Sequence, residues 1–158
     1  MAFGFRMGVS QSGGGTAKKV YLYKNGDQKV SWESPGSYYA TGYTTTPMSF
    51  LSDRISAVVG GGSSIVCLAG TVAKVDLTNY VALHIKARRN SGTNGGVVRV
   101  LNSKSDSDRA AETLFLTSGS DYVEYVLNVS NISGEKYIEL NVFQNMNADI
   151  SEVWLTKS

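Results

Sequence analysis

The sequence predicts an all-β fold built as an antiparallel sandwich of two sheets. Three observations support this: short runs in which apolar and polar residues alternate, frequent turn residues between those runs, and no convincing helical period. The chain has 158 residues with 17 glycines and only 2 prolines, a composition typical of turn-rich β proteins. About ten short strands separated by turns favour a two-sheet sandwich over one open sheet.

A short N-terminal arm is expected to precede the domain. Its apolar residues alternate with glycine and arginine, and the glycine-rich residues 11–15 that follow are typical of a flexible linker. We therefore assign 1–17 to the arm and linker, and 18–158 to the sandwich. The arm either adds as a strand to a neighbouring subunit or folds back as an edge strand of its own domain. The arm residues in question are Phe3, Phe5, Met7 and Val9.

Residues 121–155 carry the clearest pattern and predict three consecutive strands. Successive side chains of a strand point to opposite faces, so each run presents one apolar row and one mixed row. The apolar rows are Val123, Tyr125, Leu127 and Val129, then Ile138, Leu140 and Val142, then Val153 and Leu155. The mixed rows contain Tyr122, Glu124, Tyr137, Glu139, Asn141, Phe143, Glu152 and Trp154.

The remaining elements follow in chain order. The Asn25-Gly26 pair predicts a type I′ hairpin turn, because both residues accept positive φ angles. Residues 28–32 would form its return strand, and 34–47 are expected to be a loop. A compact corner is expected at 75–80, where Asp76, Thr78 and Asn79 favour local side-chain-to-backbone bonds. Further strands are expected at 55–59, 64–69, 81–89, 97–101 and 112–117.

Charge and composition exclude several classes of function. The net charge of +2 is too small to argue for a nucleic-acid partner. No apolar run approaches the ~20 residues of a membrane span, and the first residues do not resemble a signal peptide, so no route through general secretion is expected. Cys67 is the single cysteine, which excludes an internal disulfide, and its apolar surroundings predict a small buried side chain.

Three features together resemble a known family. They are the corner at 75–80 before an alternating strand, the run 125–133 followed by 137–140, and the closing run 150–155. This combination resembles the jelly-roll sandwich modules of phage and prophage tail and virion proteins, which are similar to galactose-binding-type carbohydrate-binding modules. The resemblance implies a jelly-roll fold, a virion location after synthesis in the host cytoplasm, and a homo-oligomer whose arm contacts other virion subunits. No sugar-binding motif of those families can be carried over residue by residue.

Catalysis is not expected, and no catalytic residue is assigned. His84 is the only histidine and lies in a polar row beside Lys86 and Arg88, which favours a solvated surface side chain. Three acids are expected on the same side of adjacent strands, where two carboxylates can in principle act as acid and base. Cross-strand ion pairs with Lys86 or Arg88 are the favoured role. These acids are Glu124, Glu139 and Glu152.

No cofactor is expected, with Ca²⁺ as the one ion for which the sequence offers ligands. Asp106 and Asp108, with Ser105 and Ser107, supply oxygen atoms in one charged loop. The segment lacks the glycine and the closing glutamate of a helix–loop–helix calcium site. A solvated loop is therefore the favoured interpretation.

Glycan binding is the favoured ligand hypothesis. Sugars present apolar C–H faces and hydroxyl groups, so their sites combine aromatic rings with amides, carboxylates or arginine. Two groups of residues are candidates for such a site: a mixed strand face and a loop cluster. The alternative for the face is that the loop 34–47 or the arm covers it, and the alternative for the loop is that its tyrosines merely pack the end of the sandwich. Either group could instead form a subunit interface. The first candidate is one mixed face with Trp154, Tyr137, Tyr122, Phe143, Asn141, Glu139 and Arg88. The second is a loop cluster of Trp32, Tyr38, Tyr39 and Tyr43.

The functional prediction combines these points. The chain is expected to be a non-enzymatic virion component, either a tail or fibre adhesin or a particle-decorating protein, with a cell-surface glycan as its external ligand. The alternative is a free carbohydrate-binding module of a glycan-degrading system.

Overall fold

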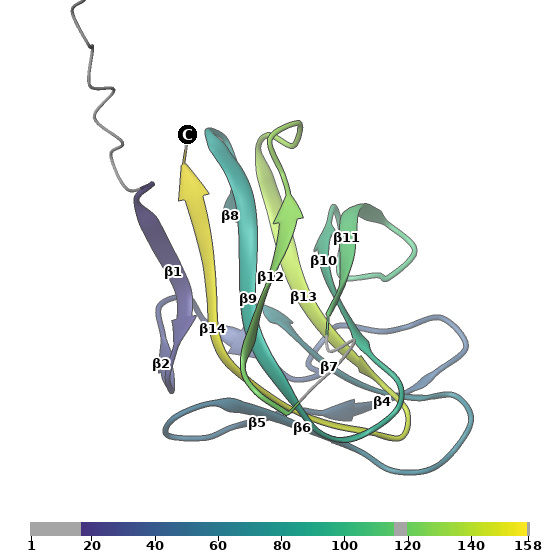
Figure 1. Cartoon of the computed structure of the whole chain (residues 1–158). Coiled ribbons are helices and arrows are strands. Elements are labelled where there is room, and N and C mark those ends of the chain that lie inside the picture. The colour runs from purple at the N-terminus through teal and green to yellow at the C-terminus, as the bar shows by residue number, and fades with distance from the viewer. Residues whose placement is uncertain (1–16, 116–119, 158) are drawn as a thin grey trace, which may run out of the picture.

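The computed structural model describes residues 17–115 and 120–157, which form two packed β-sheets (Figure 1). The N-terminal arm, with Phe3, Phe5, Met7 and Val9, lies outside these residues. Each sheet contains seven strands. The described residues contain no helix, and so none that is long and apolar enough to cross a membrane.

Sheet A and sheet B are the two layers, and they confirm the all-β sandwich. All strand pairs are antiparallel except that of β4 with β7, which is parallel. Sheet A has the order β12 (Val123–Asn128), β9 (Tyr80–Gly92), β14 (Met146–Lys157), β1 (Lys19–Lys24) and β2 (Asp27–Gln28), with β6 (Ile55–Val59) beside β14 and β5 (Ser49–Phe50) beside β6. Sheet B has the order β11 (Arg109–Phe115), β10 (Gly96–Leu101), β13 (Glu135–Phe143), β7 (Ile65–Thr71) and β3 (Trp32–Glu33), with β4 (Thr44–Pro47) beside β7 and β8 (Val75–Asp76) beside β13.

The expected apolar rows of β13 and β14 fill the core between the sheets. Their side chains are fully buried, and Cys67 joins them there as a small buried group. The prediction is wrong for Val123, which is 41% exposed because it begins the edge strand β12. The buried members of these rows are Ile138, Leu140, Val142, Val153 and Leu155.

Two turns form as their residue types require. Asn25 and Gly26 have φ angles of 47° and 90° and close the β1–β2 hairpin. The return strand is shorter than expected, because the chain leaves sheet A after Gln28 and joins sheet B at Trp32. At the corner, Asp76 accepts a hydrogen bond from the Thr78 amide at 2.9 Å, and Asn79 has a φ of 69°.

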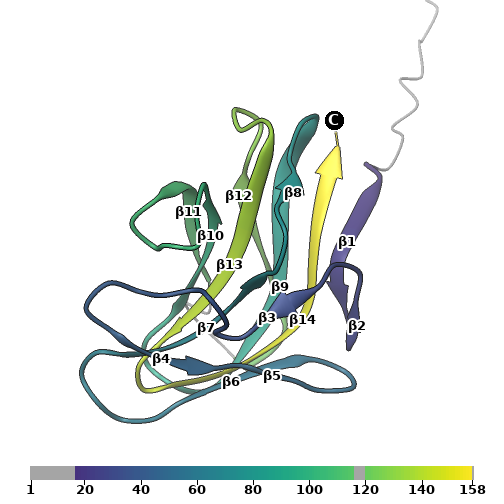
Figure 2. The same cartoon turned by 180° about the vertical axis from the view of Figure 1, so that it is seen from behind.

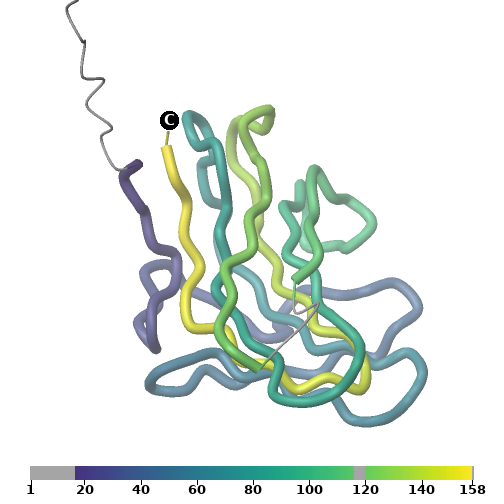
Figure 3. The backbone as a smooth tube through the Cα atoms, in the orientation of Figure 1, coloured from purple at the N-terminus to yellow at the C-terminus, as the bar shows by residue number. Residues whose placement is uncertain are grey.

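The connection from β13 to β14 decides where the functional side chains lie. The chain turns at Asn145, with a φ of 57°, and passes from sheet B to sheet A. β14 first runs beside β6, is irregular between Ile150 and Glu152, and then lies between β9 and β1 (Figure 3). β13 and β14, which are consecutive in the sequence, therefore belong to opposite layers, which Figure 2 shows from behind.

Candidate functional site

The mixed face predicted from the last three strands is divided between two opposite surfaces of the sandwich. Trp154 lies on the outer face of sheet A, whereas Tyr137, Asn141 and Phe143 lie on the outer face of sheet B. The single-face prediction is wrong because β13 and β14 are not neighbours. For the same reason Glu139 is separated from Glu124 and Glu152. The expected cross-strand ion pair does form between Lys86 and Glu152, whose charged atoms are 3.6 Å apart.

Trp154 is enclosed by its neighbours and offers no platform for a sugar. Its exposed fraction is 1%, although it lies on an outer sheet face. His84 stacks on one side with ring centroids 4.9 Å apart, and the Lys19 ammonium lies 4.2 Å from the ring centroid. His84 is itself held by Glu124 at 2.8 Å and Thr156 at 3.0 Å. The prediction of a freely solvated histidine is therefore wrong.

Tyr122 and Arg88 belong to a structural ion-pair cluster on the same side of the molecule. The Arg88 guanidinium lies 4.8 Å from the Tyr122 ring and donates to Asp149 through Nε and Nη2, at 3.1 and 2.8 Å. Burial opposes the charge of Asp149, but hydrogen bonds from Asn90 and Arg88 hold its pKa below the usual value. These groups are already satisfied by one another.

The loop cluster also separates into buried and exposed members. Trp32 packs in the main core and donates from Nε1 to the Leu22 carbonyl at 3.3 Å. Tyr38 is buried, and its hydroxyl donates to the Thr71 carbonyl at 2.8 Å. Tyr39 and Tyr43 remain 55% and 48% exposed. Only these two are available to a ligand.

The loop that carries Tyr38 covers part of the outer face of sheet B, as one alternative anticipated. A second small core forms there from Tyr38, Ala40 and side chains of β7 and β10, with Tyr137 and Phe143 packed against it. The Tyr38 ring lies directly over Gly70, where any side chain would collide with it. The loop is tied to the β10–β11 loop, since the Thr41 amide and hydroxyl both donate to Asp106.

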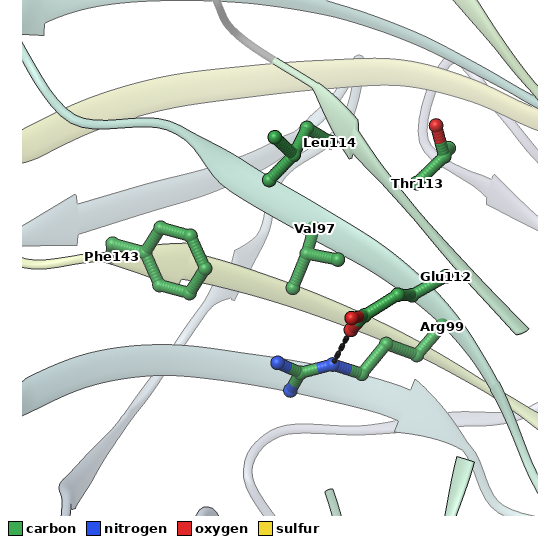
Figure 4. A pocket seen from close by; sticks show the side chains of 6 residues that line it. All are labelled: Val97, Arg99, Glu112, Thr113, Leu114 and Phe143. Carbon is green, nitrogen blue, oxygen red and sulfur yellow. Dashed lines mark hydrogen bonds and ion pairs between the residues drawn. The ribbon is translucent and has the colours of Figure 1, made fainter.

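The uncovered part of this face contains a pocket of about 480 Å³, within the ~300–1,000 Å³ range of ligand sites. Val97 and Arg99 come from β10, Glu112 and Leu114 from β11, and Phe143 from β13. Figure 4 shows Val97 between Phe143 and the Arg99–Glu112 pair, with Leu114 beside it. Leu114 is 62% exposed. The pocket thus combines an apolar platform with a polar end.

Two carboxylates orient Arg99 at the polar end. Nε donates to Glu112 and Nη1 to Glu139, each at 3.0 Å. Burial works against the charge of Glu112, but Arg99 keeps its pKa below the usual value. Burial dominates at Glu139 and raises its pKa, although Arg99 opposes the shift. Within the described ranges Arg99 Nη2 donates to no residue.

A smaller pocket of about 210 Å³ adjoins the first and shares Phe143 with it. Tyr43, Asn94 and Gln144 complete its lining. Tyr43 lies directly before β4, and both β4 and β13 are neighbours of β7. The two pockets together therefore form a groove that crosses sheet B from β11 to the start of β4. We call this the sheet B groove.

Among the residues of this groove, only Phe143 and Tyr43 were predicted from the sequence. Arg99, Val97 and Leu114 lie on predicted strands, but the local pattern did not show that their outward row would line a pocket. Asn94 and Gln144 stand in turns. One signal was present in the sequence. The outward-facing positions of these two strands include Val97 and Leu114 beside Arg99, and a face that is simply solvated does not require so many apolar residues.

The proposed calcium ligands form loop hydrogen bonds. Asp106 accepts from Thr41, and Asp108 accepts from Asn102 at 3.0 Å. No group of three histidine, cysteine or acidic side chains suited to a metal is found in the part of the chain that the structure describes. The solvated loop stays the favoured prediction, with a Ca²⁺ ion as its alternative.

Neither the protein-family models nor the curated proteins include a match to this sequence. The structure is similar to CBM29_1, a family 29 carbohydrate-binding module from Piromyces equi, with a TM-score of 0.58 and 13% identity over 90% of this chain and 92% of that chain. It is similar to the K3 cleaved adhesin domain of Lys-gingipain from Porphyromonas gingivalis, with a TM-score of 0.51 and 12% identity over 80% and 91% of the two chains. It is also similar to the enzymatically active domain of tailspike protein 4 of bacteriophage CBA120, with a TM-score of 0.50 and 15% identity over 81% of this chain but 19% of that one.

These similarities define the fold. The chain has the jelly-roll β-sandwich fold found in carbohydrate-binding modules.

Proposed function

We propose that the protein binds a glycan chain in the sheet B groove and does not cleave it. One observation carries this proposal: a pocket lined by the apolar side chains of Phe143, Val97 and Leu114, of which Leu114 is the largely exposed one, also contains an arginine that two carboxylates hold in place. The platform suits the C–H face of a sugar ring, and Arg99 suits its hydroxyl oxygens. The carbohydrate-binding-module fold of the chain supports the same ligand class.

The geometry of the two acids argues for binding without hydrolysis. Glu112 and Glu139 have pKa values shifted in opposite directions, as an acid–base pair would require. The Glu139 side chain, however, has no exposed surface and is paired with Arg99. A general acid must reach the glycosidic oxygen, and an enclosed carboxyl group does not. The pair is therefore assigned to holding Arg99.

The biological setting that we propose is a virion surface, as a tail or fibre adhesin or a decorating protein. The tailspike similarity supports this only through the fold. A free carbohydrate-binding module of a glycan-degrading system would use the same groove. Mass spectrometry of purified phage particles from the source strain tests the setting: the chain should be present in stoichiometric amount, and its absence from particles would favour the free module.

A glycan array followed by calorimetry tests the binding proposal. The parent protein should bind a defined glycan set, and Leu114→Ala and Phe143→Ala should each weaken binding about tenfold or more, as for a central contact residue. Tyr39→Ala removes an exposed aromatic ring outside the groove and should have little effect. Leu114 is largely exposed, so its variant keeps the test valid if Phe143→Ala unfolds. No binding by the parent, or unchanged binding in both groove variants, would refute the proposal.

A further inference from the structure

The smaller pocket of the sheet B groove has a lining that differs from that of the larger one. Its volume of about 210 Å³ is below the ~300 Å³ at which drug-sized ligand pockets begin, so it suits a small part of a glycan chain. Its lining consists of two aromatic rings, from Tyr43 and Phe143, and two primary amides, from Asn94 and Gln144. No lining residue carries a charge, which disfavours a carboxylate, sulfate or ammonium substituent.

The backbone around this pocket orients one of the amides. The Asn94 Nδ2 donates to the backbone carbonyl of Gln144, and the Phe143 amide donates to the Gly95 carbonyl at 3.0 Å. These bonds join the β9–β10 loop to the end of β13. With Nδ2 engaged, the Asn94 oxygen is the acceptor that remains for a ligand. The Gln144 side chain makes no hydrogen bond to residues 17–115 or 120–157, so its amide can still donate and accept.

We propose that the smaller pocket binds the acetamido group of a 2-acetamido sugar, with the attached sugar chain lying along the larger pocket. This inference rests on the proposed glycan-binding function and names its substrate class. An acetamido group has three parts that match the lining. Its N–H can donate to Asn94, its carbonyl can accept from Gln144, and its methyl group can pack against the rings of Tyr43 and Phe143. A hydroxyl group at the same carbon has no apolar part to fill the space between the rings.

Two matched ligands test the inference by calorimetry on the full chain. They are the β-1,4-linked tetrasaccharide of N-acetylglucosamine and the β-1,4-linked tetrasaccharide of glucose, which share linkage and ring stereochemistry and differ at the 2-position. We expect the acetamido ligand to bind about tenfold more tightly, as two added hydrogen bonds and a buried methyl group imply. Equal affinity, or tighter binding of the glucose ligand, would overturn the inference.

A variant separates recognition of the acetamido group from binding of the chain. Gln144→Glu keeps the shape of the side chain and removes its donor, so affinity for the acetamido ligand should fall about fivefold more than affinity for the glucose ligand. Asn131→Asp makes the same amide-to-carboxylate change at an exposed position in the 129–134 turn and should leave the preference intact. An unchanged preference in Gln144→Glu would also overturn the assignment.

Failure of this inference differs from failure of the proposed function. If neither tetrasaccharide binds, the acetamido assignment is refuted. Binding of another glycan that is lost in Leu114→Ala would still support a glycan groove. Absence of all glycan binding would refute both.

Discussion

Arg99 Nη1 lies 3.0 Å from Glu139 Oε1, and this ion pair is enclosed on the outer face of sheet B, where a solvated surface would be expected. The Glu139 side chain has no exposed surface, and that of Arg99 has 9%. Two acceptors beside the pair, Glu139 Oε2 and Asn141 Oδ1, are buried without a hydrogen-bond partner in the described structure. Since unmatched buried polar groups are costly, this cluster is where substitutions should have their largest effects.

Arg99→Met should destabilise the fold strongly. It leaves the carboxylate of Glu139 buried without its partner, which typically costs about 3–5 kcal/mol in the free energy of unfolding. Denaturant unfolding at neutral pH measures the loss. Arg109→Ala removes the exposed arginine that also contacts Glu112 and should cost less than about 1 kcal/mol. Similar losses in the two variants would contradict the assigned role.

Glu139→Gln should change how stability depends on pH. Because burial raises the pKa of Glu139 in the folded state, its stabilising contribution is fully present below the unfolded-state pKa and is lost as pH rises through the folded-state pKa. The variant should therefore gain stability relative to the parent as pH increases from about 4 to about 8. Thermal unfolding across that range measures the difference.

Glu112→Gln is the matched control for this titration. Burial opposes ionisation of Glu112, but Arg99 holds its pKa below the usual value in the folded state. The contribution of ionised Glu112 to the stability of the fold is present above the unfolded-state pKa and is lost as pH falls through the folded-state pKa. This variant should therefore lose stability relative to the parent at neutral pH and converge with it in acid. Parallel pH profiles for the two variants would be inconsistent with opposite shifts.

Gly70→Ala should displace the loop that covers sheet B. A Cβ atom at Gly70 would lie 2.2 Å from Cζ of Tyr38, a buried ring that has no room to move. We expect a loss of about 1–3 kcal/mol, as in other overpacked sites, and weaker glycan binding because the same loop leads to Tyr43. Limited proteolysis of residues 34–43 would detect the release. Gly60→Ala, where the added Cβ meets nothing within 4 Å, should show neither effect.

Trp154→Phe should lower stability without weakening glycan binding. Trp154 is stacked between His84 and Lys19 on the face opposite the groove, so no ligand reaches it. A loss of about 0.5–3 kcal/mol is typical for such a buried substitution. Calorimetry with the glycan that the parent protein binds should give the same affinity within error. A loss comparable to that of Phe143→Ala would move the binding site to sheet A.

Local features of the sequence were sufficient for most strands and for the hairpin turn, but the predictions of a return strand at 28–32 and of a loop through 47 were wrong, because β4 forms at Thr44–Pro47. The alternation of Ile138, Leu140 and Val142 identified the row that enters the core, because strand side chains alternate regardless of the partner strand. Asn25 and Gly26 identified the hairpin, because the turn depends on their own φ angles. The exposed part of the site was partly visible too, since Tyr43 and Phe143 were among the candidates.

Only the tertiary structure decided which of these rows share a surface. β13 and β14 follow one another in the chain, yet the turn at Asn145 sends them to opposite sheets, and this separates Trp154 from Phe143. The loop with Tyr38 then covers one part of sheet B and leaves the groove open beside it. Strand alternation is set by neighbours one or two residues away. Sheet assignment and coverage depend on pairing between distant segments and on the burial of a shared core, which no short stretch of sequence contains.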